Sequence, residues 1–122
     1  MKVNEAVAAA SRLIGEGIER RELIGWLSEI ETTVVTEIAD THMGAVGNPS
    51  PIDPESDGER QLFAPDPYSR LYVSYLIMKS DLAFRDVPQY LNSSRVFAEA
   101  YNSYADWYNR TYMPLGVREI KV

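Results

Sequence analysis

The stretch IERRELIGWLSEIETTVVTEIADT, residues 18–41, decides the fold class of this chain. Its large apolar side chains recur at steps of four and three residues, which places them on one face of an α-helix. These side chains are Leu23, Leu27, Ile30, Val34 and Ile38. The spacing predicts a helix from about Ile18 to Thr41.

The residues before this stretch have the same kind of pattern. Apolar side chains lie at helical spacing over residues 3–14, and Asn4 is a candidate N-cap. Gly15 and Gly17 then break the pattern. We therefore expect a separate first helix over residues 3–14.

Two further helices are expected in the second half of the chain. Asp66-Pro67 suits a helix start, because an acceptor side chain stands at the cap and a proline follows it. We expect Pro88 to interrupt or end this third helix, and a fourth to run from about Asn92 to Pro114. The predicted core stripe of the third helix is Leu71, Tyr75, Met78 and Leu82, with Tyr68, Tyr72 and Leu76 alongside. That of the fourth is Phe97, Tyr101, Tyr104 and Tyr108.

Residues 43–66 show no helical pattern and are rich in glycine and proline. Loops of this length are uncommon in compact domains and are usually functional or disordered. A short β-hairpin within the loop stays open. We expect the loop and the C-terminal tail, residues 115–122, to be ordered by partners. The predicted fold is therefore an all-α bundle of three to four helices with this long loop and an extended C-terminal tail.

Composition narrows the possible chemistry. The 122 residues, 45% hydrophobic and 25% charged, are typical of one packed globular domain, residues 1–122. The chain has no cysteine and a single histidine, His42, which excludes disulfides, thiolate metal sites and sites that need two histidines. Its longest apolar stretch is too short for a membrane span. We expect no enzymatic activity, no cofactor and no metal ion.

The charge is unevenly distributed along the chain. The net charge is −6, and residues 1–64 hold 12 acidic and 5 basic side chains, whereas residues 65–122 hold 6 and 7. Proteins that grip nucleic acid use Lys and Arg to neutralise phosphates. An acidic chain without a basic run is therefore a poor candidate for nucleic-acid binding.

Two acidic motifs resemble metal or catalytic sites, and neither is complete. Asp53–Gly58 mimics the opening of a calcium loop, but its twelfth position is Ala64, where a bidentate Glu is needed. Asp40 and His42 stand two residues apart, so on a helix they point to different faces. We interpret the first motif as a solvated acidic loop and the second as the end of a helix.

Tyrosine use is the most unusual feature of the sequence, because all eight tyrosines lie at or after residue 68. Tyrosines among arginines can stack on nucleic-acid bases. Their helical spacing instead favours a seam between two helices, with the hydroxyls at its rim. A protein-binding surface is the other interpretation, since Tyr, Trp and Arg are enriched there. Trp107 lies off the main stripe and either broadens the core face or anchors a partner.

Several runs of the chain resemble small structural proteins of tailed bacteriophages and prophages. These runs are WLSEIE (26–31), LFAPDPYSRLYVSYL (62–76), YLNSS (90–94), FAEAY (97–101) and WYNRTYMP (107–114). The proteins they resemble are the head–tail connectors, also called adaptors or head-completion proteins. The motifs are patterns of aromatic packing rather than chemical signatures, and the family has no catalytic residues to transfer.

The resemblance implies a mostly helical subunit that assembles as a ring of twelve beneath the portal protein. Such a ring extends the DNA channel, lets genomic DNA pass without specific binding and presents a surface to a stopper or tail-completion protein. The expected location is the neck of the virion, after synthesis in the bacterial cytoplasm. The residues expected at protein interfaces are Trp107, Tyr112, Leu115, Val117, Ile120 and Val122.

Two alternatives stay open at this point. One is a different neck or tail-completion component of a bacteriophage. The other is a small helical regulator that binds a host protein through its tyrosine-rich face. Decoration of the portal by the protein would favour the adaptor, and failure to bind the portal would favour the regulator.

Overall fold

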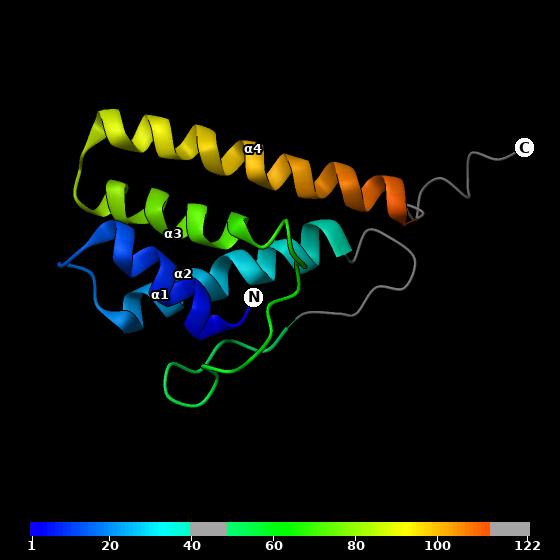
Figure 1. Cartoon of the computed structure of the whole chain (residues 1–122), viewed down its shortest axis with the longest axis horizontal. Helices are drawn as coiled ribbons and strands as arrows, with labels where there is room; N and C mark the ends of the chain where they lie inside the picture. The colour runs from blue at the N-terminus through cyan, green and yellow to red at the C-terminus, as the bar shows by residue number, and fades with distance from the viewer. Residues whose placement is uncertain (40–48, 113–122) are drawn as a thin grey trace, which may run out of the picture.

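The structure is a computed structural model that describes residues 1–39 and 49–112. Its elements are α1 (Val3–Ile14), α2 (Arg20–Thr33), a π-helical turn η1 (Val34–Ile38), α3 (Arg70–Ala83) and α4 (Val87–Thr111). The predicted all-α fold class is confirmed (Figure 1). The described part of the loop contains no β-hairpin, and its one ladder contact is an isolated antiparallel bridge between Lys2 and Gln61.

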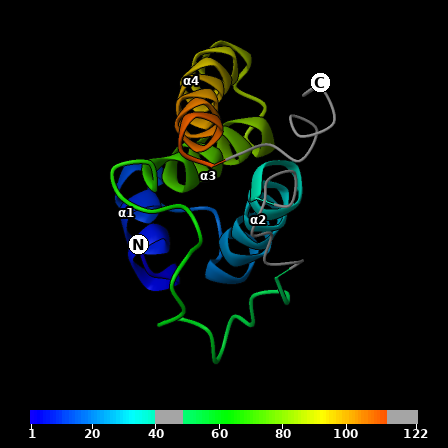
Figure 2. The ribbon, with the colours of Figure 1, turned by 90° about the vertical axis from the view of Figure 1, so that its right-hand side faces the viewer.

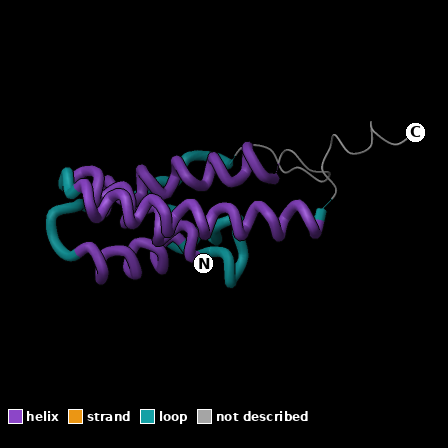
Figure 3. The backbone as a smooth tube through the Cα atoms, turned by 90° about the horizontal axis from the view of Figure 1, so that it is seen from above, coloured by secondary structure: helices purple, strands orange, loops and turns teal. Residues whose placement is uncertain are grey.

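The helices form layers around α3. Helix α4 packs along one side of α3, and α1 and α2 pack against the other side (Figure 2). The connection between α1 and α2 and the connection between α3 and α4 lie at the same end of the bundle (Figure 1 and Figure 3). None of the described helices is long and apolar enough to cross a membrane.

The central position of α3 explains why its predicted core stripe is only partly correct. The buried residues of α3 are Leu71, Tyr72, Leu76 and Ser80, whereas Leu82 is 50% exposed. Tyr75 and Met78 are half-buried. A single-stripe prediction assumes one covered face, but α3 is covered on both sides and is apolar on most of its circumference.

The first two helices follow the sequence prediction closely. Helix α1 has the predicted bounds, and the apolar face of α2 and η1 is buried from Leu23 to Ile38. The α-helical part of the second helix is shorter than predicted because it ends at Thr33 and continues as η1. Asp40 and His42 lie outside the described residues.

Asn4 is not the N-cap of α1 but lies inside its first turn. The first amide groups of α1 instead donate to the loop. Val3 N lies 3.0 Å from the carbonyl oxygen of Arg60, and Asn4 N lies 2.9 Å from that of Gly58. The loop thus satisfies amides that a helix start leaves without an intrahelical partner.

Helix α3 begins at Arg70, not at Asp66-Pro67. The Asp66–Pro67 peptide bond is cis, and the Asp66 carboxylate accepts a hydrogen bond from the Ser69 hydroxyl instead of capping a helix at residue 67. The segment is therefore a turn that precedes the helix.

Pro88 belongs to the start of α4, not to the end of α3. Helix α3 ends at Ala83, and the chain reverses through Arg85, whose φ of 57° lies in the left-handed region. The Asp86 carboxylate then accepts from Gln89 N at 3.2 Å and caps α4. Pro88 occupies the first turn, where its missing N–H costs nothing, so α4 starts before the predicted Asn92.

The described part of the long loop packs on the helices of its own chain. Ile52, Leu62 and Ala64 are buried, and Leu62 N donates to the carbonyl oxygen of Met1 at 2.9 Å. The expectation that a partner orders this loop is therefore wrong for residues 49–66. Of residues 43–48 and of the tail, residues 115–122, the structure describes nothing.

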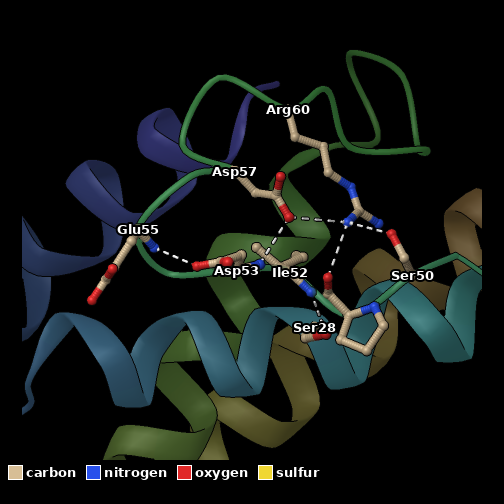
Figure 4. Close-up of polar contacts among 8 residues, drawn as sticks. Ser28, Ser50, Ile52, Asp53, Glu55, Asp57 and Arg60 are labelled. Carbon is tan, nitrogen blue, oxygen red and sulfur yellow. Dashed lines mark hydrogen bonds and ion pairs between the residues drawn. The ribbon is translucent and has the colours of Figure 1, made fainter.

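In the acidic turn of this loop, the carboxylates of Asp53 and Asp57 accept hydrogen bonds from backbone amides of the same turn (Figure 4). Asp53 Oδ1 accepts from Glu55 N at 2.8 Å, and Asp57 Oδ2 accepts from Asp53 N at 2.8 Å. Arg60 Nη1 lies 3.6 Å from Asp57 Oδ2, and Ile52 N donates to Ser28 Oγ on α2 at 3.1 Å. These contacts close the turn on itself and attach it to α2.

Candidate protein-binding site

Six aromatic side chains gather around the C-terminal half of α4, and we call them the aromatic cluster: Phe63, Tyr68, Tyr104, Trp107, Tyr108 and Tyr112. The Trp107 ring stacks on Tyr68 with 5.2 Å between ring centres. The rings of Tyr108 and Tyr112 are 4.4 Å apart. The cluster therefore joins α4 to the turn that leads into α3.

Of the six predicted interface residues, the structure describes Trp107 and Tyr112. The rings of these two residues are 6.2 Å apart and nearly perpendicular. Trp107 is half-buried against the core, and Tyr112 is 42% exposed. Leu115, Val117, Ile120 and Val122 lie outside the described residues.

A buried carboxylate lies beneath the aromatic cluster. Glu31 of α2 is 3% exposed, and its two oxygens accept from the Tyr72 hydroxyl at 2.6 Å and from Phe63 N at 2.8 Å. Ala64 N in turn donates to the Tyr72 hydroxyl oxygen at 2.9 Å. Burial raises the pKa of Glu31, while the hydrogen bonds from Tyr72 and Phe63 oppose that rise.

Tyr104 carries the one buried side-chain polar atom in the described chain without a hydrogen-bond partner. Its side chain is fully buried in the aromatic cluster, and burial, reinforced by the nearby Tyr108 and Glu31, raises the pKa of its hydroxyl. A buried hydroxyl without a partner loses its hydration with no compensation. The Tyr104 ring therefore fills space in the core, while the burial of its unpaired hydroxyl destabilises the fold.

Two tyrosine–glutamate contacts connect α3 to α2 and α4 to η1. The Tyr75 hydroxyl lies 3.3 Å from Glu29 Oε2, and the Tyr101 hydroxyl lies 3.3 Å from Glu37 Oε2. Partial burial, with help from the neighbouring carboxylate, raises the pKa of each phenol to about 12. These phenols stay neutral at physiological pH, so they act as hydrogen-bond donors and not as bases.

A groove of about 340 Å³ runs between α3 and α4. Its wall includes the half-buried Tyr68 and the exposed residues Arg70 and Val96. The rest of the lining comes from Pro67, Glu99 and the small side chains of Ser74, Ala100 and Ser103. Because small side chains line it, this groove can receive a protruding side chain.

Metal-ligating side chains do not form a cluster within residues 1–39 and 49–112. No three His, Asp or Glu side chains gather there as a metal ion would require. The Asp53 carboxylate is held by backbone amides of its own turn, which lower its pKa.

Sequence reasoning missed Glu31 and the unpaired hydroxyl of Tyr104. A signal for Glu31 was present, because it stands four residues after Leu27 and three before Val34, on the apolar face of α2. Nothing in the sequence shows which tyrosine loses its partner, since that depends on where α4 packs on α3.

No family model, curated protein or solved structure matches this chain. The functional argument therefore rests on the residues themselves and on how the fold arranges them.

Proposed function

We propose that this protein is a head–tail adaptor of a tailed bacteriophage. In this role copies of the chain form a ring beneath the portal protein, extend the DNA channel and hold the next neck protein. One observation carries the proposal: the sequence runs that resemble connector proteins, residues 62–76 and 107–112, meet in the aromatic cluster. Two of the runs that carry the resemblance are thus neighbours in the folded chain.

The exposed end of the aromatic cluster supports a binding role. Trp, Tyr and Arg dominate the energetics of protein interfaces because they combine a large apolar area with polar atoms. Tyr112 is 42% exposed at the end of α4, with Trp107 beneath it and Arg110 nearby in sequence. A rigid 25-residue helix presents these side chains in a fixed geometry.

The charge of the chain supports a position beside DNA without adhesion to it. The net charge of −6 repels phosphates, and the described ranges contain no run of basic residues. A channel subunit of this charge would let DNA pass.

The proposal is tested by mixing the purified protein with the portal ring encoded in the same genome. Electron microscopy of the mixture should show one added ring, with the rotational symmetry of the portal, on one face of the portal. Failure to decorate the portal, together with capture of a bacterial host protein at one-to-one stoichiometry, would overturn the proposal in favour of a host-binding regulator.

A further inference from the structure

The end of the long loop, residues 62–64, is attached to the bundle through two side chains. Phe63 N donates to the carboxyl group of Glu31 on α2, and Ala64 N donates to the hydroxyl of Tyr72 on α3. These loop residues belong to no helix. The backbone at residues 63 and 64 is therefore held to the helices by an acid and a phenol, and not by the hydrogen bonds of a secondary-structure element.

Glu31 is a buried acid that forms no ion pair with a described residue. The groups that interact with it electrostatically are the phenols of Tyr72 on α3 and Tyr104 on α4, Arg60 in the loop and the N-terminal ammonium group. Arg60 makes its ion pair with Asp57 instead. An ionised carboxylate is costly to bury without a cation in contact, and burial accordingly raises the pKa of Glu31.

A protonated Glu31 fits the closed position of the loop end. Glu31 Oε1 and the Tyr72 hydroxyl oxygen are 2.6 Å apart, and in their neutral forms either group can donate to the other. With the proton on Oε1, the Tyr72 hydroxyl accepts from Glu31 as well as from Ala64 N, while Glu31 Oε2 still accepts from Phe63 N. The contacts that hold residues 63 and 64 are therefore compatible with a neutral acid.

An ionised Glu31 instead favours an opened loop end. If residues 62–64 move away from the helices, water reaches the carboxylate and hydrates its charge. Segments outside helices and strands commonly open at a lower free energy than the whole fold. Opening would uncover the surface beneath the buried residues Leu62 and Ala64, and would separate the Phe63 ring from Tyr108, 6.3 Å away in the aromatic cluster.

We propose that residues 62–64 are a pH-sensitive latch, which detaches from α2 and α3 when Glu31 gives its proton to water while the helices stay folded. The closed latch holds the proton more tightly than the open latch, so the open population grows as the pH rises. Opening changes the composition of the aromatic cluster, because Phe63 leaves it. The inference does not depend on the proposed function, since it concerns how the chain holds its own loop.

Hydrogen exchange of the Phe63 and Ala64 amides, measured by NMR between pH 5 and pH 8, tests the latch. The protection factor is the ratio of the intrinsic exchange rate to the observed rate, so it removes the ordinary effect of pH on exchange. Both protection factors should fall by up to about tenfold per pH unit below the folded-state pKa of Glu31 and level off above it, because opening releases one proton in that range. Protection factors that stay constant with pH would overturn the proposal.

Glu31→Gln and Glu29→Gln are a matched pair of variants on α2. Glu31→Gln keeps a carbonyl oxygen for Phe63 N and an N–H group for the Tyr72 hydroxyl, so it imitates the protonated acid. Its protection factors should be constant with pH. Glu29→Gln changes an exposed carboxylate of the same helix and should keep the fall seen in the wild type. A fall that persists in Glu31→Gln, or one that disappears in Glu29→Gln, would overturn the proposal.

Exchange of the wild-type protein in low concentrations of urea separates the latch from global unfolding and does not depend on the folding of any variant. A local opening exposes little surface, so exchange of Phe63 and Ala64 should be nearly independent of urea. Exchange of Leu76, in the middle of α3, should accelerate with urea because it requires the helix to unfold. Equal protection and equal urea dependence of all three amides would mean that the loop end opens only with the whole fold, and would overturn the proposal.

Discussion

The hydroxyl of Tyr72 lies 2.6 Å from a carboxylate oxygen of Glu31, and this buried contact joins α3 to α2. The same carboxylate holds Phe63 N, and the same hydroxyl accepts from Ala64 N. The Glu31 carboxylate and the Tyr72 hydroxyl thus hold the end of the long loop in place. Buried polar groups arranged in this way stabilise a fold only while all of them stay paired.

Tyr72→Phe should therefore destabilise the protein. The substitution removes a donor from a buried carboxylate and leaves Ala64 N without its acceptor, which costs about 2–4 kcal/mol for two such losses. Urea unfolding followed by circular dichroism measures the change. Tyr75→Phe is the matched control, because the Tyr75 hydroxyl is half-buried and its 3.3 Å contact to Glu29 is long. An equal loss of stability in the control would contradict this account.

Glu31 should make stability fall as the pH rises. Burial raises the pKa of this carboxyl in the folded protein above its ordinary value of 4.5, so the folded state holds the proton more tightly. The stabilisation by the protonated form is fully present below pH 4.5 and is lost as the pH rises through the folded-state pKa. Arg60 and the N-terminal ammonium moderate the shift without reversing it.

Comparison of the wild-type protein with Glu31→Gln isolates this effect. The lowered pKa values of Asp53 and Glu59 act in the opposite direction, with stability lost as the pH falls, but they are common to both proteins. The stability of the wild type relative to Glu31→Gln should decrease between pH 4.5 and neutrality in urea unfolding experiments. A difference that is constant with pH would contradict the prediction.

Tyr104→Phe should leave stability unchanged or raise it by about 1 kcal/mol. The variant keeps the ring in the aromatic cluster and removes a buried hydroxyl that has no partner among the described residues. Thermal unfolding of Tyr104→Phe and Tyr72→Phe side by side should give shifts of opposite sign or very different size. A loss of more than about 1 kcal/mol in Tyr104→Phe would reveal a hydrogen bond that the described residues do not supply.

Two glycine substitutions should have opposite effects. A Cβ at Gly58 would lie 2.8 Å from Cγ of Asn4, whose side chain accepts from Arg20 at 2.6 Å, so Gly58→Ala should cost about 1–3 kcal/mol. Gly25 lies in α2 with nothing within 4 Å of a new Cβ, so Gly25→Ala should stabilise the protein by about 1 kcal/mol. Differential scanning calorimetry measures both changes, and shifts of the same sign would contradict the packing described.

Tyr112→Ala should weaken portal binding about tenfold while changing the free energy of unfolding by less than about 1 kcal/mol. The reason is that Tyr112 lies at the end of α4 and is 42% exposed, so its ring is the most accessible to a partner in the aromatic cluster. Binding to the immobilised portal gives the affinity, and urea unfolding gives the stability. Leu91→Asn serves as a control, because it changes an exposed apolar side chain near the other end of α4. Unchanged portal affinity in Tyr112→Ala would remove Tyr112 from the binding surface.

Helix bounds could be predicted where a helix has one buried face. The face from Leu23 to Ile38 and the extent of α1 were predicted correctly, because apolar spacing records which side faces the core. The same reasoning failed for α3, which is covered on two sides, and for Pro88, which starts a helix instead of ending one. For α3 the neighbouring helices decided the outcome, whereas for Pro88 it was the Asp86 cap, a local feature that the prediction overlooked.

The candidate site was only partly predictable. Trp107 stood out because it lies off the main tyrosine stripe of its helix, and both residues because Tyr and Trp are enriched at protein interfaces. The contact of Trp107 with Tyr68 and that of Glu31 with Phe63 join segments more than 30 residues apart in the chain. The groove likewise exists only where α3 and α4 lie side by side.

The sequence by itself determined the helical class, the absence of thiol chemistry, the acidic charge and the concentration of tyrosines in the second half, because these follow from residue types and short-range spacing. Only the tertiary structure decided which phenols are buried, which carboxylate they hold and which charges stay without a partner. The physical reason is that burial and pairing depend on contacts between helices, and such contacts are set by how whole helix surfaces pack and not by the order of residues within one helix.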